Sequence, residues 1–190
     1  MRRIAAVLLA LAATGSAAAG PKEAVHDAFG KLLAAKSFRA TVTDVTKNEE
    51  VSSMEFVAPD RYRVQSKQGP ATIIIGDDGW MDVGGKPMKV PMPVGKIIAQ
   101  FRNQQTAQQL EAGMAVTDAG SENVDGEPTH VYTYKVTEPM TADMKLWVSD
   151  KTGLPVQLES KGSFMGRPGQ TRIHYRDFND TSIAIAVPQG

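Results

Sequence analysis

The feature that most constrains the fold of this chain is a series of short extended segments separated by turn residues. From Phe38 onward apolar and polar residues alternate, as in Ala40 and Val42, which alternate with Arg39, Thr41 and Thr43, and this period is typical of a strand with one buried face. Glycine- and aspartate-rich turns, such as residues 76–79 and 150–153, separate many of the segments. The candidate strands are centred on Ala40, Phe56 and Tyr62 and otherwise span residues 71–75, 80–83, 114–116, 131–134, 144–148, 154–158, 172–178 and 183–187.

Two segments have the period of an amphipathic helix. The first begins at Pro21, a residue favoured in the first turn of a helix, and ends near Lys36. Its apolar stripe consists of Val25, Ala28, Phe29, Leu32 and Leu33. The second follows Pro93 and ends near Gly113, with a narrow stripe of Val94, Ile97, Ile98 and Phe101. Residues 86–93, just before it, contain three prolines, which favours an edge strand or a loop.

These patterns predict a mainly β, α+β fold with a large antiparallel sheet of about ten strands. A sheet of this size curls as it twists, so its concave face needs a cover. The two amphipathic helices provide that cover. The length of 190 residues, without a repeat or a dividing linker, favours a single domain over residues 20–190.

The first nineteen residues are predicted to form a secretory signal peptide that is removed. Arg2 and Arg3 precede an apolar run over residues 4–13, and small residues follow it with an Ala-Ala-Ala exit at 17–19. We expect cleavage after Ala19, with Ala17 as the alternative. The run is too short for a bilayer about 30 Å thick, so a transmembrane anchor is the weaker interpretation. The mature chain is therefore expected to act outside the cytoplasm, without a membrane anchor.

Composition argues against several classes of function. The chain has no cysteine, which excludes a disulfide, a thiolate metal site and a thiol nucleophile. Without residues 1–19 it carries 19 basic and 21 acidic residues, a balance that favours neither nucleic acid nor an anionic membrane surface. The three histidines, His26, His130 and His174, lack metal-ligand spacing, and no nucleophile motif is present. We therefore predict no enzyme, no metal site and no cofactor.

Methionine is the residue type that stands out. The mature chain has eight, and Met81, Met88 and Met92 lie in or beside turns, where a simple core does not need them. Methionine adapts its shape to varied apolar partners. Two interpretations stay open: the methionines fill gaps in an imperfect core, or they line a lipid-sized apolar cavity under a helical lid.

Several short motifs occur in a characteristic order. They are Ser37-Phe38-Arg39-Ala40 after the first helix, Pro59-Asp60-Arg61-Tyr62-Arg63 after a strand, the strand, turn and aromatic residue over 73–80, and a closing segment over 183–190. In these features nearly the whole mature chain resembles the periplasmic lipoprotein-carrier superfamily, which has the LolA/LolB-like fold. The resemblance implies an open half-barrel of antiparallel strands whose helices close an apolar cavity.

The resemblance also implies a function and a location. Members carry acyl chains or whole lipids across the periplasm, or sense them, so the partner expected here is a lipid or the acyl chain of a lipoprotein. The expected ligand-binding residues are Met54, Phe56, Tyr62, Val64, Ile73, Ile75, Trp80, Met88, Ile97, Ile98, Phe101, Met144 and Leu146. The alternative is an envelope sensor or interaction module that contacts an inner- or outer-membrane protein through an open sheet edge.

One position departs from the pattern of the superfamily. In the carrier proper, an arginine precedes the proline of the second motif and latches the lid helices in the closed state. Here that position is Ala58, followed by Pro59, and alanine offers no side-chain donor. The sequence therefore supports generic lipid binding better than the specific task of shuttling lipoproteins.

Overall fold

A computed structural model describes residues 20–101, 114–137, 141–164 and 167–188. Within them, helices α1 (Pro21–Ala34) and α2 (Val94–Phe101) accompany one antiparallel sheet. Its eleven strands are β1 (Ser37–Asp44), β2 (Glu49–Val57), β3 (Arg61–Ser66), β4 (Thr72–Ile75), β5 (Asp78–Val83), β6 (Lys86–Lys89), β7 (Thr117–Val124), β8 (Glu127–Val136), β9 (Ala142–Ser149), β10 (Pro155–Phe164) and β11 (Arg167–Arg176). The predicted fold class is confirmed.

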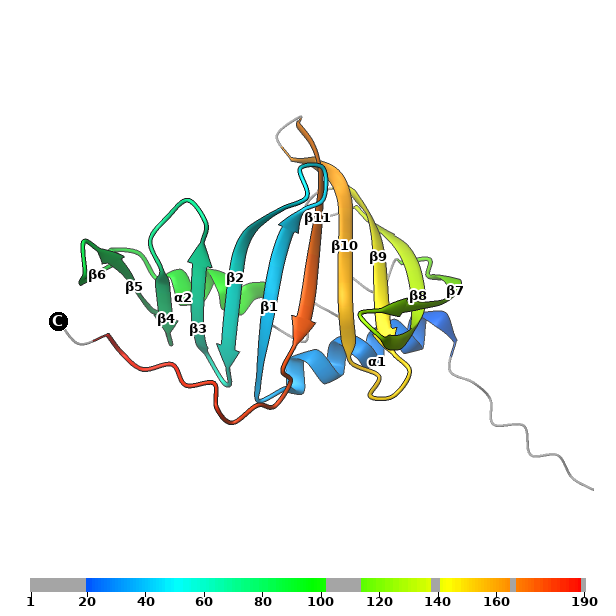
Figure 1. Ribbon diagram of the computed structural model, residues 1–190, viewed down its shortest axis with the longest axis horizontal. Coiled ribbons are helices and arrows are strands. Elements are labelled where there is room, and N and C mark those ends of the chain that lie inside the picture. Colours follow the sequence, from blue (N-terminus) through cyan, green and yellow to red (C-terminus); the bar gives the residue numbers. More distant parts are fainter. Residues whose placement is uncertain (1–19, 102–113, 138–140, 165–166, 189–190) are drawn as a thin grey trace, which may run out of the picture.

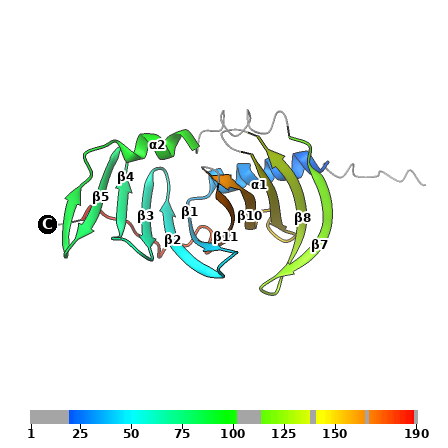
Figure 2. The ribbon, with the colours of Figure 1, turned by 90° about the horizontal axis from the view of Figure 1, so that it is seen from above.

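The strands follow the order β6-β5-β4-β3-β2-β1-β11-β10-β9-β8-β7 across the sheet. Within β1–β6 and within β7–β11 successive strands pair with each other, and the pairing of β1 with β11 joins these two halves in the middle of the sheet. The sheet remains open, with β6 and β7 at its outer edges (Figure 1). It curves along its length, and both helices lie on the same side of it (Figure 2).

Strand register decides which side chains face the helices. Phe38, Phe56, Tyr62 and Ile74 lie directly opposite one another across β1, β2, β3 and β4. They form one buried cluster, against which Leu32 of α1 and Val94 and Ile98 of α2 pack. Because side chains alternate between the faces of a strand, the residues in register with this row lie on the helix-covered face, here called the concave face. Their immediate neighbours lie on the convex face.

A second buried cluster occupies the other half of the concave face. Val25 and Ala28 of α1 pack there with Tyr134, Leu146 and Val148. The helix contacts β7, β9 and β10, whereas α2 contacts β4 and β5. The predicted stripe of the first helix is thus the face that α1 buries, and each helix covers a different half of the sheet.

The C-terminal segment is not the strand that its alternating residues predict. Residues 183–187 form no strand, although Ile183 and Ile185 are buried. Side chains on the convex face bond the backbone here: Arg61 donates to the carbonyl of Ile185 at 2.7 Å, and Arg63 donates to that of Ala184 at 3.0 Å. The alternation of apolar and polar residues over 183–187 therefore arises because one side of an extended segment is buried, although the segment pairs with no strand. In Figure 1 the segment runs from β11 past the lower ends of β1 to β4.

Other boundaries differ from the predictions by a few residues. Residues 114–116 precede β7 and are not strand, whereas the predicted turn over 166–169 overlaps the start of β11. The segment over 86–93 begins with the edge strand β6, as predicted, and continues as a loop. The predicted second helix is seen as α2 up to Phe101, and its continuation to Gly113 lies outside the described residues, as does the predicted signal peptide.

Candidate functional site

The floor of the candidate site is an aromatic row on the concave face. The ring centroids of Phe38 and Phe56 are 5.1 Å apart, and those of Phe56 and Tyr62 are 5.2 Å apart, both in tilted arrangements. Tyr175 of β11 and Phe178, just after this strand, extend the group, with their centroids 5.8 and 5.7 Å from that of Phe38. Aromatic pairs at these separations favour a fixed packing. The floor is therefore well ordered and apolar.

A second row on the same face leads from the centre of the sheet to its open edge. Opposite one another lie, in order, Ala40, Met54, Val64, Thr72, Met81 and Met88. Exposure rises along this row: Ala40 is 1% exposed, the four middle residues are half-buried, and Met88 is 54% exposed. Five of the six side chains are apolar, so the row forms a continuous apolar track that is open at the β6 end.

The N-terminal end of α2 is attached to the turn between β4 and β5 by an unusually close backbone contact. The amide of Gly95 donates to the carbonyl of Asp77 at 3.4 Å. A Cβ atom at Gly95 would lie 1.7 Å from the carbonyl oxygen of Gly76, a distance that no side chain tolerates. Val94 also packs on Gly79. Only glycine therefore allows α2 to approach the sheet this closely.

A cavity of about 470 Å³ lies where the C-terminal end of α1 meets α2 and the turns after β2 and β4. Phe56 and Tyr62 form its aromatic part, and small residues form most of its wall, namely Ala34, Ala35, Ala58, Gly76, Gly95 and Ala99. Asp60 and Asp77 also line it. Its volume falls within the range of about 300–1,000 Å³ that is usual for small-molecule sites. Ala58, the position that departs from the superfamily pattern, borders this space directly.

A second cavity, of about 370 Å³, lies in the other half of the sheet and is more polar. Tyr134 and Met144 contribute to it, but so do Asp143, Lys145, Glu159 and Lys161. Although Lys145 and Glu159 are paired with Glu122 and Arg172, the charged lining makes this cavity a poor site for an apolar chain. The cavity beside α2 is therefore the better candidate for an apolar ligand.

The structure brings together a subset of the sequence-predicted site residues. Met54, Phe56, Tyr62, Val64 and Met88 belong to the two concave rows, and Ile98 packs against the same cluster. Met144 and Leu146 also lie on the concave face, but in the cluster under α1. Ile97 and Phe101 belong to α2, and their side chains lie outside the described part of the structure.

Ile73, Ile75 and Trp80 lie on the opposite face from the rest of the set. Ile73 is in register with Arg63 on one side and with Trp80 on the other. This row belongs to the convex face, where Arg61 and Arg63 hold the C-terminal segment. The geometry therefore separates these three residues from the cavity, because the one-residue alternation along β4 and β5 turns them away from it.

Sequence reasoning also missed residues that do belong to the concave face. Ile173 and Tyr175 of β11 pack against the cluster around Phe38, and Leu158 of β10 packs against the cluster under α1. Met81, which the sequence had already offered as a cavity-lining methionine, completes the apolar track. The alternation of Ile173 and Tyr175 with polar neighbours was the signal that could have identified them.

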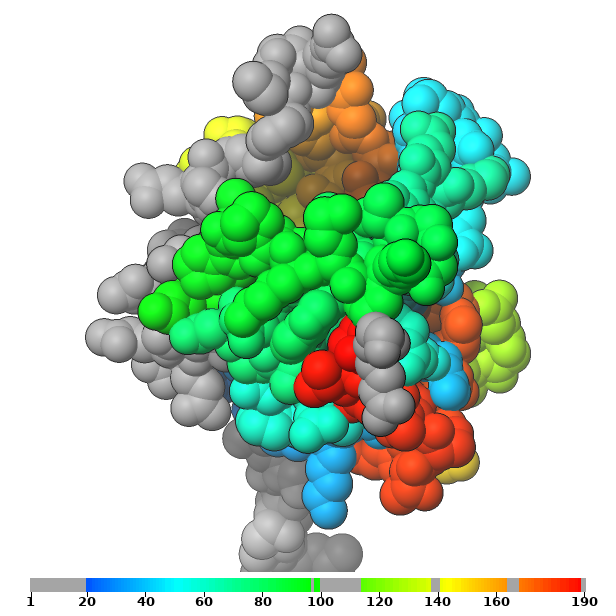
Figure 3. Space-filling view, turned by 90° about the vertical axis from the view of Figure 1, so that its left-hand side faces the viewer, coloured from blue at the N-terminus to red at the C-terminus, as the bar shows by residue number. Residues whose placement is uncertain are grey.

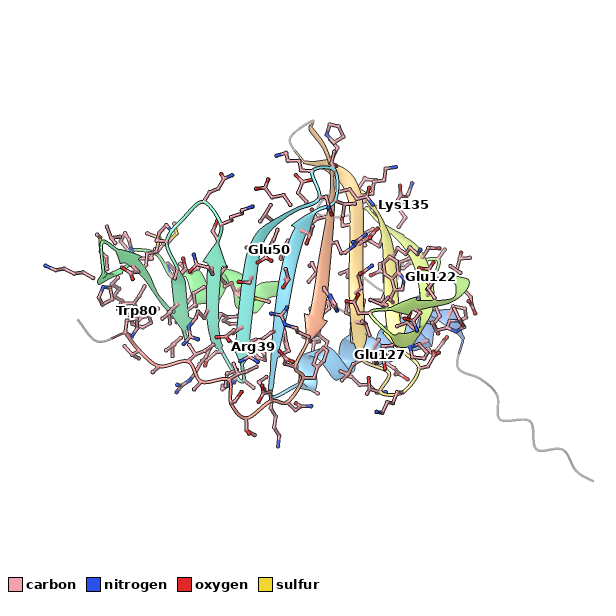
Figure 4. The ribbon with its side chains drawn as sticks, in the orientation of Figure 1. Arg39, Glu50, Trp80, Glu122, Glu127 and Lys135 are labelled. Atoms are coloured by element: carbon pink, nitrogen blue, oxygen red, sulfur yellow. The ribbon has the colours of Figure 1, made fainter. Side chains whose placement is uncertain are left out.

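Besides Ile73, Ile75 and Trp80, the convex face carries a network of ion pairs. Arg39, labelled in Figure 4, donates to Glu55 at 2.9 Å and to Asp177 and Asp180 at 3.1 Å each. Arg63 donates to the second oxygen of Glu55. Hydrogen bonds to Glu55 and Asp177 raise the pKa of Arg39 above its usual value, and backbone and side-chain bonds from Ser182 lower the pKa of Asp180. These contacts fix the C-terminal segment to β1–β3.

A metal-binding cluster is not found among the described residues. No group of three His, Asp or Glu side chains there is arranged to hold a metal ion. His130 contacts Asp118 at 2.8 Å, and His174 Nδ1 lies 3.5 Å from Asp125, so each of these histidines is paired with one carboxylate. Burial raises the pKa of Tyr132, beside His130, and Asp118 and Asp150 raise it further. Within the same residues, no helix is both long and apolar enough to cross a membrane.

Comparison with solved structures identifies the fold. The lipoprotein LppX of Mycobacterium tuberculosis aligns with a TM-score of 0.65 at 11% identity, over 87% of this chain and 97% of LppX. LprF of Mycobacterium bovis aligns with a TM-score of 0.67 at 12% identity, over 90% of this chain and 97% of LprF. No family model and no curated protein sequence matches the chain. The chain therefore has a LolA/LppX-like fold, the open antiparallel half-barrel that its motifs predict.

Proposed function

We propose that this protein is a periplasmic carrier that binds an acyl chain non-covalently between the concave face and α2. The observation that carries the proposal is the apolar track on the concave face, which runs beside a cavity of about 470 Å³. Such a site needs no ionic contact, because burying a chain of about a dozen carbons contributes roughly 10 kcal/mol. The fold of LppX and LprF is compatible with this role.

The proposed binding residues follow from the geometry. Phe56 and Tyr62 provide the rigid aromatic floor, and Met54 and Val64 provide half-buried surface that can adapt to different chains. Ile98 packs on the floor from α2. In this arrangement α2 is the lid, because the strands that its described residues mainly contact are β4 and β5, near one end of the sheet.

The proposal is tested by binding of a fluorescent fatty acid and by native mass spectrometry of the purified mature chain. We expect saturable uptake and a mass that corresponds to bound lipid. A protein that stays free of ligand and takes up no fatty acid would contradict a carrier function.

Ile98→Asp tests the role of α2 directly. A carboxylate at this half-buried position, on the apolar floor, has no compensating partner, so we expect uptake to be lost while the melting temperature stays within a few degrees. Ile98→Val is the matched control and should retain uptake. If stability collapses together with binding, α2 is a structural helix; if Ile98→Asp still binds, the ligand site lies elsewhere.

An interaction module is the second candidate function, and the open edge at β7 favours it. This eight-residue strand is almost entirely exposed and pairs only with β8. An unpaired edge of this length offers backbone groups to an extended segment of an envelope protein. A stoichiometric protein recovered from periplasm with the wild-type chain, in the absence of bound lipid, would favour this function over the carrier.

A further inference from the structure

Exposed apolar side chains are concentrated at one end of the molecule. Of the five large hydrophobic residues that are exposed in the described part of the chain, three lie in β5, β6 and the loop after them. They are Val83, Met88 and Met92, with 47%, 54% and 55% of their surface exposed. Figure 3 shows this end of the molecule, with β5, β6 and the loop that follows them (green) at the surface. A grouping of this kind on a folded protein indicates an interaction site.

Charge at this end is divided between the two faces. Lys89 lies on the convex face and is neutralised by Asp78 at 2.9 Å. Lys86 is in register with Val83, on the concave side, and forms no ion pair with any described acid. The concave side of the β5–β6 hairpin thus combines the exposed apolar Val83 and Met88 with Lys86, a cation that no acid in the described part of the chain neutralises. We call these three residues, together with Met92 in the loop that follows β6, the hairpin surface.

The edge at β6 is poorly suited to an extended protein partner. The strand has only four residues, and one of them is Pro87, which cannot donate a backbone hydrogen bond. A short edge that carries proline and lysine discourages strand addition. Apolar side chains beside a cation, on an edge that cannot be extended, instead match the interface of a phospholipid bilayer.

The hairpin surface is also continuous with the proposed site. Met88 is the outermost residue of the apolar track, and Met81, Val64 and Met54 continue it toward the centre of the concave face. An acyl chain that leaves a bilayer at Met88 can therefore follow this largely apolar surface to the neighbouring row of Phe56 and Tyr62, which line the cavity.

We propose that the hairpin surface docks on a phospholipid bilayer, and that acyl chains enter the half-barrel there, along the track from Met88 to Met54. This proposal rests on the proposed carrier function. Docking is driven mainly by the apolar groups, since the chain as a whole has a slight excess of acidic residues. Binding is therefore expected to depend only weakly on salt.

The test is co-sedimentation of the mature chain with phosphatidylethanolamine–phosphatidylglycerol vesicles, comparing Val83→Glu and Met92→Glu with the wild type. Each variant places a charge where an apolar side chain enters the interface, so we expect partitioning to fall by roughly tenfold. Val51→Glu is the matched control, because Val51 is exposed (38%) but lies on β2, away from the hairpin. It should bind vesicles like the wild type, and all the variants should melt normally.

Binding of a fluorescent fatty acid in vesicle-free solution separates this proposal from the carrier function. Val83→Glu and Met92→Glu should take up the fatty acid from solution normally but accept it slowly from vesicles. If the wild type takes up free fatty acid yet does not sediment with vesicles, or if both variants sediment as well as Val51→Glu, the docking proposal is refuted. If the wild type takes up no fatty acid in solution, the carrier function itself fails.

Discussion

Gly95→Ala is the sharpest test of how α2 is attached to the sheet. The added Cβ would lie 1.7 Å from the carbonyl oxygen of Gly76 and 2.9 Å from the Cα of Asp77, whereas ordinary contacts begin at 3.4 Å. Both neighbours are backbone atoms of a turn, so no side chain can rotate away. The helix must therefore move outward by about 1.5 Å or more, a displacement of the size that overpacking forces on a core.

The expected cost follows from the contacts that this movement disrupts. Val94 and Ile98 are half-buried against the cluster around Phe56, and partial loss of both, with the strain of overpacking, costs about 2–3 kcal/mol. The better helix propensity of alanine returns at most about 1 kcal/mol. For a domain of this size, the net loss lowers the melting temperature by roughly 3–8 °C.

Gly30→Ala is the matched control, because Gly30 lies inside α1 and a Cβ there would meet no atom within 4 Å. It should raise the melting temperature by about 1–4 °C through helix propensity alone. Thermal denaturation followed by circular dichroism measures both variants, and fatty acid titration shows whether the displaced helix weakens binding. If Gly95→Ala is as stable as Gly30→Ala, the close contact between α2 and the β4–β5 turn does not exist in solution.

Two further predictions concern the ion pairs of the convex face. Hydrogen bonds from Lys145 and Trp147 lower the pKa of Glu122 below the ordinary value of 4.5. The ionised Glu122 therefore stabilises the folded state above that pH, and this contribution is lost as the pH falls through the lowered pKa. In melting curves recorded from pH 7 to 3, Glu122→Gln should accordingly lose less stability than the wild type. Arg39→Met removes the shared partner of Asp177 and Asp180, and we expect faster proteolysis within residues 177–188. No such change is expected in Arg172→Met, which removes an ion pair with Glu159 instead; equal cleavage rates would show that Arg39 does not hold this segment.

The sequence predicted the sheet well because its strands are short, alternating and bounded by turns. Tyr62 and Val64 alternate with arginines, and the structure places the apolar pair on the concave face and the arginines on the convex face. The same logic failed at residues 73–75, since three consecutive isoleucines contain no alternation from which a face could be assigned. Register with Tyr62 puts Ile74 on the concave face and its two neighbours on the other.

The sequence could not reveal interactions between segments that are distant along the chain. The alternation of Ile183 and Ile185 is indistinguishable from that of a strand, and only the carbonyl contacts of Arg61 and Arg63 show a different origin. The contact of Gly95 with Gly76 depends likewise on where α2 meets the sheet. The cavity is a product of this contact, so its lining could be only partly predicted.

The difference between the two faces indicates how the molecule could open without unfolding. On the convex face, Arg39 and Arg63 join β1, β2 and β3 to the C-terminal segment through side chains on four separate stretches of the chain. On the concave face, α1 leads within three residues into β1, the central strand of the sheet, whereas α2 is attached through Val94, Gly95 and Ile98. The free energy needed to lift α2 is therefore a small part of the total, since lifting it breaks these contacts and no strand pairing. A ligand that displaces α2 would meet the aromatic floor already ordered, and the cost of binding would be limited to moving the lid.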